Sequence, residues 1–360
     1  MPLESHYIVN GLLNGGLLPQ PLPQLLISVF TMLLLRLPPE ILIQIFDHLG
    51  PPFFRQNLRR LTICKHWLEF ALPACFRRLN LSQETMRRLI ASGVIERPSL
   101  LRDSLETLDI ELVEYRYSKC TADGTPSGHS YETKINVLND DLAQFAIVAQ
   151  QSRRLRTLRI QAWSGPTPDY PNFREDSLSL PMIQAFLSLD NLGVLILDLS
   201  NEPEQHGDGH ICTAIGALLG TLRTLELRMP RICPEVLKPR DPSAILRLSE
   251  VVITLSMANA DHELEEEPGP HSQRCGSQAG GLLQLQAEML QQAEILATQM
   301  ASPKALRIIS HSPLDFKEES LDVLTGKTMI WDYSDDTDEE FSEPESEILD
   351  VLPSKMINIF

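Results

Sequence analysis

Apolar residues near the front of the chain recur at the spacing of an α-helix. Pro38 and Pro39 suit a first helical turn, where a missing backbone N–H costs nothing, and Glu40 complements the positive end of the helix dipole. Gly50 and the two prolines after it predict the end of this helix. Between these limits the apolar positions fall on one broad helical face, and they are Ile41, Leu42, Ile45, Phe46 and Leu49.

A second helical pattern follows this turn. Pro73 is expected to end or kink that helix, and Ser82 is expected to cap a further short helix that finishes at Gly93. Two or three short helices over about forty residues are close to the lower size limit of a stable domain, so they are expected to need a partner surface. The apolar side of the second helix carries Leu58, Leu61, Cys64, Leu68 and Ala71.

From Leu105 onward the pattern changes to a recurring six-residue unit of the form L-x-x-L-x-[LI]. The alternating end of each unit predicts a short strand with one buried face, and helical patterns are expected between units at 141–150, capped by Asn139, at 181–189 and at 211–219. The unit recurs at Leu105-Leu108-Ile110, Leu155-Leu158-Ile160, Leu192-Leu195-Leu197, Leu222-Leu225-Leu227 and Leu248-Val251-Ile253, with an echo near Leu306-Ile309.

The first of these two regions resembles the F-box, the helical module that docks a substrate receptor onto the Skp-family adaptor of cullin–RING ubiquitin ligases. The matching residues are Leu37-Pro38-Pro39-Glu40-Ile41-Leu42, Ile45-Phe46, Leu49 and Cys64-Lys65-x-Trp67-x-x-Phe70. The resemblance implies that the shared core and adaptor-binding surface consist of Leu37, Pro38, Ile41, Leu42, Ile45, Phe46, Leu49, Leu61, Cys64, Trp67 and Phe70.

The second region resembles an irregular leucine-rich-repeat solenoid, in which strands and helices alternate and the strands are parallel. Its units start 50, 37, 30 and 26 residues apart, which indicates degenerate repeats with long insertions. The expected fold class is therefore a small helical F-box module followed by a leucine-rich-repeat-like α/β solenoid and an acidic disordered tail, as in fungal-type proteins of that pattern. The expected boundaries are a leader at 1–35, the F-box at 36–81, the repeat domain at 82–334 with a flexible insertion at 258–281, and the tail at 335–360.

Composition restricts the partners and the compartment. The net charge of −17 and a pI near 5.0 argue against nucleic acid, because phosphate binding requires clustered Lys and Arg. The apolar run at 25–35 is shorter than the about twenty residues that span a bilayer, so no membrane association is expected, and a packing helix, a disordered leader or a gene-model error stay open for 1–35. Six widely spaced cysteines without a CxxC pair indicate reduced thiols in the cytoplasm or nucleus.

Candidate binding residues lie in the insertions. Trp163, Tyr170, Phe173 and Arg174 combine the residue types that anchor protein interfaces, although packing on their own repeat explains them too. The apolar stripe of 282–300 fits either packing on the solenoid or docking of a partner. His206, His210 and Cys212 lie close together without a fourth ligand nearby in the sequence, so neither a metal site nor a cofactor is predicted.

No catalytic motif accompanies these features, since G-x-S-x-G, H-E-x-x-H and the Gly-rich dinucleotide fingerprint are all missing from the sequence. The function expected from the resemblance is a non-catalytic substrate receptor of an SCF-type ubiquitin ligase, bound to a Skp-family adaptor, through it to a cullin, and to an unknown protein target. One alternative is an F-box scaffold that binds partners without directing ubiquitination. Another is a solenoid binding protein that has no adaptor.

Overall fold

The computed structural model describes residues 36–61, 63–93, 95, 98–112, 128–162, 178–199, 210–257, 271–276, 281–311 and 318–331. The chain is a mixed helix and strand protein with a parallel-rich sheet. The predicted leader at 1–35 and the predicted tail at 335–360 lie outside the described residues, as does the segment with Trp163, Tyr170, Phe173 and Arg174. No helix among the described residues is long and apolar enough to cross a membrane.

The predicted helical module consists of α3 (Pro39–Arg55), a 3-10 turn η1 (Leu58–Leu61) and α4 (Lys65–Phe76). Gly50 interrupts α3 with a φ of 69°, as expected of a residue without a Cβ, and one more helical turn follows it. The second predicted helix begins later than expected, and it does not end at Pro73. It starts only at Lys65, with the Cys64 sulfur capping the N–H of Trp67 at 3.3 Å, and it passes through Pro73.

A nine-stranded sheet follows the module. Its first seven strands are parallel and stand in chain order, whereas β10 and β11 continue the sheet after β9 in antiparallel pairing. The strands are β1 (Arg78–Ser82), β2 (Thr107–Glu111), β3 (Thr157–Ala162), β4 (Val194–Leu199), β5 (Thr224–Arg228), β7 (Glu250–Thr254), β9 (Ala305–His311), β10 (Glu318–Asp322) and β11 (Lys327–Trp331).

The six-residue units coincide with the strands, and the strand register aligns them into two apolar rows. One row contains Leu79, Leu108, Leu158, Leu195, Leu225, Val251 and Leu306. The other contains Leu81, Ile110, Ile160, Leu197, Leu227, Ile253 and Ile308. All these side chains are buried in one continuous core, because residues two apart on a strand share a face.

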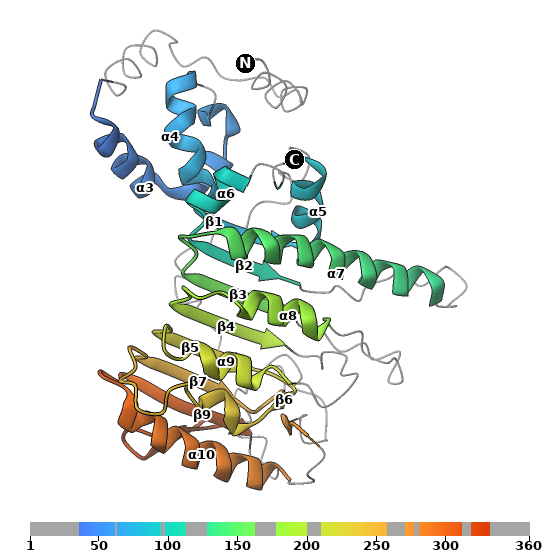
Figure 1. Ribbon diagram of the computed structural model, residues 1–360, viewed down its shortest axis with the longest axis vertical. Helices are drawn as coiled ribbons and strands as arrows, with labels where there is room; N and C mark the ends of the chain where they lie inside the picture. Colours follow the sequence, from blue (N-terminus) through green and yellow to red (C-terminus); the bar gives the residue numbers. More distant parts are fainter. Residues whose placement is uncertain are drawn as a thin grey trace, which may run out of the picture.

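Helices cover one face of this sheet. Figure 1 shows α7, α8, α9 and α10 side by side on that face, with the helical module beyond β1. The helices that connect the strands are α5 (Gln83–Ala91), α6 (Pro98–Ser104), α7 (Gly128–Gln151), α8 (Leu180–Leu187), α9 (Cys212–Leu218), the 3-10 turn η2 (Pro234–Leu237) and α10 (Leu282–Gln299).

The helix predictions hold for α8, α9 and α10 within two residues, whereas for α7 the end is right within one residue and the start is wrong. That helix begins at Gly128, so Asn139 lies inside it and caps nothing; instead its Oδ1 accepts a hydrogen bond from the backbone N–H of Ser179 at 3.2 Å. The apolar stripe of α10 packs into the core through Leu285, Met289 and Leu296. This packing answers the question that the sequence left open for that helix.

The predicted insertion at 258–281 is partly wrong. His271 to Gly276 lie within the described residues, and Gln273–Arg274 form a strand, β8, parallel to β6 (Arg231–Ile232). The hydroxyl of Ser272 donates to the carbonyl of Met229 at 2.7 Å, which fastens this return segment to the body of the protein. The segment therefore belongs to the fold, and it carries Cys275.

Candidate functional site

The helical module has its own hydrophobic core. Phe46 is 1% exposed, and its ring makes edge contacts with Phe54 at 5.6 Å and Trp67 at 4.6 Å between centroids. The indole N–H of Trp67 donates to the carbonyl of Arg60, and the guanidinium of Arg60 lies over the Phe53 ring at 4.2 Å. The module thus buries the inner face of α3 without a partner.

The residues predicted to bind an adaptor divide into three groups by exposure. Buried in the module core are Leu42, Phe46, Leu61 and Trp67. Half-buried are Leu37, Ile45, Cys64 and Phe70. Exposed are Pro38, Ile41 and Leu49. The structure therefore assigns the first group to the stability of the module and leaves the others accessible in whole or in part.

Three apolar residues of α3 that are exposed or half-buried form a ridge. Ile41, Ile45 and Leu49 are four residues apart and so follow one row along the helix, beside the row of the buried Leu42 and Phe46. Ile41 is 40% and Leu49 37% exposed. We call these three residues the α3 ridge.

Two exposed apolar residues of the module were not among the predicted binding residues. Ile43 is 46% and Ile63 40% exposed. Their exposure was not readable from periodicity, because Ile43 lies between two core positions and Ile63 lies in a connection.

Arg77 joins the module to the sheet. Its guanidinium contacts Asp47 of α3 at 2.6 Å and Glu106, just before β2, at 2.7 Å. The hydrogen bond to Glu106 is the main reason why the pKa of Arg77 lies above its ordinary value. The side chain of Arg55 adds hydrogen bonds to the carbonyls of Cys75 and Arg78. The module and the first strands are thereby held by charge-assisted contacts as well as by packing.

The sheet face opposite the helices carries paired charges. Asp109 and Arg159 are register partners on β2 and β3, and Asp198 and Arg228 are partners on β4 and β5, with 3.9 Å between charged atoms of the second pair. Burial raises the pKa of both aspartates, and the neighbouring arginines lower it in part. An oxygen of Asp109 and the Nε of Arg159 are buried without a hydrogen-bond partner among the described residues.

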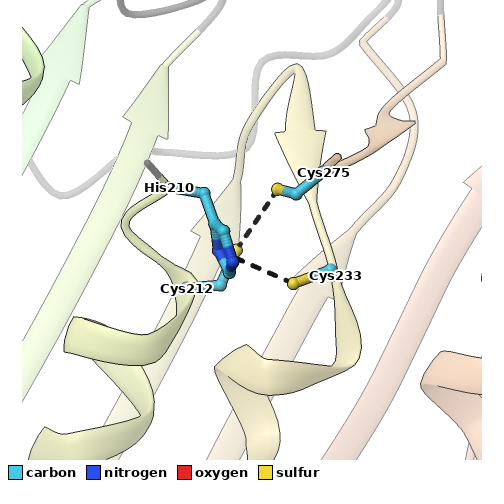
Figure 2. Close-up of side chains that lie close together, drawn as sticks. All are labelled: His210, Cys212, Cys233 and Cys275. Carbon is cyan, nitrogen blue, oxygen red and sulfur yellow. Dashed lines mark hydrogen bonds between the residues drawn. The ribbon is translucent and has the colours of Figure 1, made fainter. Parts of the chain in front are cut away.

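A second cluster lies at the carboxyl ends of β4, β5 and β7. His210 and Cys212 precede and begin α9, Cys233 follows β6, and Cys275 follows β8. The pairing of β6 with β8 places Cys233 and Cys275 next to each other, because each is the residue after its strand. Figure 2 shows the four side chains converging on one point from these segments.

The distances within this cluster are short. The sulfurs of Cys212 and Cys275 are 3.7 Å apart, and the Cys233 sulfur is 3.8 Å from Nδ1 of His210. One donor atom from each of the four residues lies within 4.8 Å of all the others. Contacts with Cys212 and Cys275 lower the pKa of Cys233, whereas contacts with Cys233 and Cys275, together with burial, raise the pKa of Cys212.

Close helix packing supports this arrangement. A Cβ on Gly216 of α9 would lie 2.5 Å from the carbonyl oxygens of both Glu235 and Lys238, so only glycine allows α9 to approach η2 this closely. Cys212 lies one turn before Gly216, and Cys233 is the N-cap residue of η2. Of the three residues that the sequence grouped, His210 and Cys212 belong to this cluster, and His206 lies outside the described residues. Cys233 and Cys275 were missed because they are distant in sequence from that pair.

Comparison with known proteins adds no assignment. No model of a known protein family matches the chain, and no curated protein matches it.

Proposed function

We propose that this protein is a substrate receptor of an SCF-type cullin–RING ubiquitin ligase. In this proposal the module of α3, η1 and α4 docks a Skp-family adaptor, and the strand-and-helix domain, as a leucine-rich-repeat-like solenoid, binds the target. The chain itself contributes no chemical step. Its role is to raise the local concentration of the target near the conjugating enzyme.

The observation that supports this proposal is the α3 ridge. A free-standing helical hairpin would keep its apolar residues inside, yet Ile41 and Leu49 are exposed on a helix whose inner face is already filled by Leu42 and Phe46. Contiguous apolar residues on such a helix mark a surface that a partner covers. The ridge residues also belong to the sequence pattern that resembles the F-box.

The exposed fraction of the ridge side chains sets the expected contribution to adaptor binding. Complete burial of a large aliphatic side chain stabilises by about 1.5–3 kcal/mol, so the 40% of Ile41 that is still exposed contributes about 1 kcal/mol when an adaptor covers it. A glutamate at position 41 would lose this contribution, and its carboxylate would also lose hydration when the adaptor covers it. For Ile41→Glu with Leu49→Glu the expected loss is about 2–4 kcal/mol, roughly 30- to 1,000-fold in Kd.

The experiment is a titration of purified full-length protein with a Skp-family adaptor by calorimetry. Wild type is expected to bind, and the Ile41→Glu, Leu49→Glu double variant is expected to lose binding with unchanged circular dichroism. Ile295→Glu is the matched control, because Ile295 is 46% exposed on α10, far along the chain from the module. Absence of binding by wild type, or equal binding by the double variant, would refute the adaptor role.

Capture from cells then separates a ligase receptor from a scaffold. A receptor is expected to bring down adaptor and cullin, and loss of the α3 ridge is expected to raise the level of its target. A scaffold would bind the adaptor while target levels stay the same. Arg159→Glu and Arg228→Glu test whether the polar sheet face holds the target, since they reverse charges there and leave the module unchanged.

A further inference from the structure

We propose that His210, Cys212, Cys233 and Cys275 bind a zinc ion that fastens three consecutive strand-to-helix connections together. This site is independent of the adaptor and target roles proposed above. It lies on the segments after β4, β5 and β7, whereas the α3 ridge lies in the helical module beyond β1 (Figure 1).

The spacing of the donors fits a tetrahedral ion. With Zn–S bonds of about 2.3 Å, two sulfurs on a tetrahedron are roughly 3.8 Å apart, and a sulfur and an imidazole nitrogen are roughly 3.5 Å apart. The Cys212–Cys275 sulfurs are 3.7 Å apart, and the Cys233 sulfur and His210 Nδ1 are 3.8 Å apart. A zinc ion therefore fits among the four atoms with small side-chain adjustments.

The chemistry of the donors selects the metal. Three thiols and one imidazole form the Cys₃His set of structural zinc sites, whereas Mg²⁺ and Ca²⁺ require oxygen ligands. Four protein donors complete a tetrahedron and leave no position for water or substrate, so the ion has a structural role. No carboxylate belongs to the donor set.

Burial and backbone positions also favour an ion over unligated thiols. Cys212 and Cys233 are buried, and His210 and Cys275 are half-buried, so the donor atoms are largely shielded from solvent. Gly276 directly follows Cys275 and has a φ of 88°, so the chain turns sharply just after Cys275, whose sulfur lies beside the other donors. Cys233 is the N-cap of η2, a position held by the close α9–η2 contact at Gly216.

A single ion would add a further link between the body of the protein and the segment that carries Cys275. That segment pairs with the body through a strand of two residues, through the hydrogen bond of Ser272 to Met229, and through an ion pair of Arg274 with Glu288 at 2.9 Å. Short strands of this kind contribute little by themselves. Binding of zinc only to the folded arrangement would stabilise that arrangement by linkage.

The test measures metal in the full-length chain purified from zinc-supplemented cells without chelators. Elemental analysis is expected to give about one zinc per chain, and exchange for Co²⁺ is expected to produce intense d–d and sulfur-to-cobalt bands. Cys275→Ser and Cys233→Ser are expected to lose the metal. Cys64→Ser is the matched control, since Cys64 lies in the helical module and a serine hydroxyl can replace its sulfur as the cap of α4.

A readout on the wild-type chain keeps the proposal testable if a serine variant fails to fold. Thiol alkylation with mass spectrometry is expected to show Cys212, Cys233 and Cys275 protected in the native protein and labelled after a chelator is added, with Cys64 labelled equally in both states. Wild type that lacks zinc and gives no cobalt–thiolate band would overturn the proposal. So would equal zinc content in Cys64→Ser and Cys275→Ser, or a Cys212–Cys275 disulfide in protein prepared under reducing conditions.

Discussion

Replacing Gly216 by alanine would place a methyl group at a close contact between α9 and the backbone of η2. The new Cβ would lie 2.5 Å from the carbonyl oxygens of both Glu235 and Lys238, below the 3.0 Å that real Cβ contacts respect. Both oxygens belong to the backbone, so no side-chain rotation can relieve the contact. The α9 helix must therefore move away from η2, and Cys212 must move away from Cys233.

Two effects of opposite sign set the magnitude for Gly216→Ala. Alanine is better than glycine inside a helix by about 1 kcal/mol, whereas an extra methyl in a close-packed contact costs about 1–3 kcal/mol or more. With two backbone oxygens in the way, overpacking is expected to win and the free energy of unfolding to fall by about 1–2 kcal/mol. For a domain of this size the Tm should drop by about 2–8 °C.

Thermal unfolding followed by circular dichroism measures this change, and Gly220→Ala is the control. A Cβ on Gly220 meets no atom within 4 Å, so this second variant is expected to stay within about 0.5 kcal/mol of wild type. If Gly216→Ala were as stable as Gly220→Ala, the predicted overpacking would be refuted, because the methyl group at position 216 would then have no measurable steric cost. A matched fall in zinc content is expected for Gly216→Ala only.

Three other predictions concern the module and the sheet. Phe46→Ala should lower the free energy of unfolding of the module by about 3–5 kcal/mol, because the ring is buried against Phe54 and Trp67. Hydrogen exchange should then accelerate in α3 and α4 while β3 to β5 stay protected. Uniform acceleration would contradict a separate module core. Arg77→Met should cost about 1–2 kcal/mol, measured by denaturant unfolding, because contacts to Asp47 and Glu106 are lost, and an unchanged midpoint would argue against this link. Burial raises the pKa of the Asp198 carboxyl above its ordinary value of 3.8, so the folded state binds a proton at this group more tightly than the unfolded state does. The ionised carboxylate therefore destabilises the fold at neutral pH. This destabilisation disappears as the pH falls through the raised pKa toward 3.8. Asp198→Asn should then be at least as stable as wild type at about pH 7, with the difference shrinking on acidification; a loss larger at about pH 7 than at about pH 4.5 would mean that the Arg228 ion pair outweighs burial.

Apolar periodicity predicted most of the parallel strands, because each of them places two residues of one face into the core. It missed β1, although Phe76, Leu79 and Leu81 have the same spacing as the predicted units, with phenylalanine in the first place. It also predicted too short an α7. The face of that helix that packs on the sheet was found, but polar residues before it are compatible with helix or loop and only the tertiary structure decides between them.

The Cys/His cluster was beyond local reasoning for a different reason. Zinc sites are recognised in sequences by donors a few residues apart, yet Cys212 and Cys275 are 63 residues apart and His210 and Cys233 are 23 apart. Strand pairing sets their distance in space, since β6 and β8 run in register and end at neighbouring cysteines. Cysteine spacing in the sequence therefore fails to predict a metal site whenever strand pairing, rather than a short local loop, brings the donors together.

The position of this cluster also bears on the irregular length of the units. In an array of stacked strand-and-helix units each unit contacts only its neighbours, so an insertion weakens cooperativity locally. The units that begin at Leu192, Leu222 and Leu248 each contribute at least one donor to the cluster, and two of them contain segments outside the described residues. A zinc ion shared by three successive units would make them unfold as one block despite these insertions. The units nearer the helical module have no such link among the described residues, and there the long α7 and the Arg77 contacts hold successive strands together.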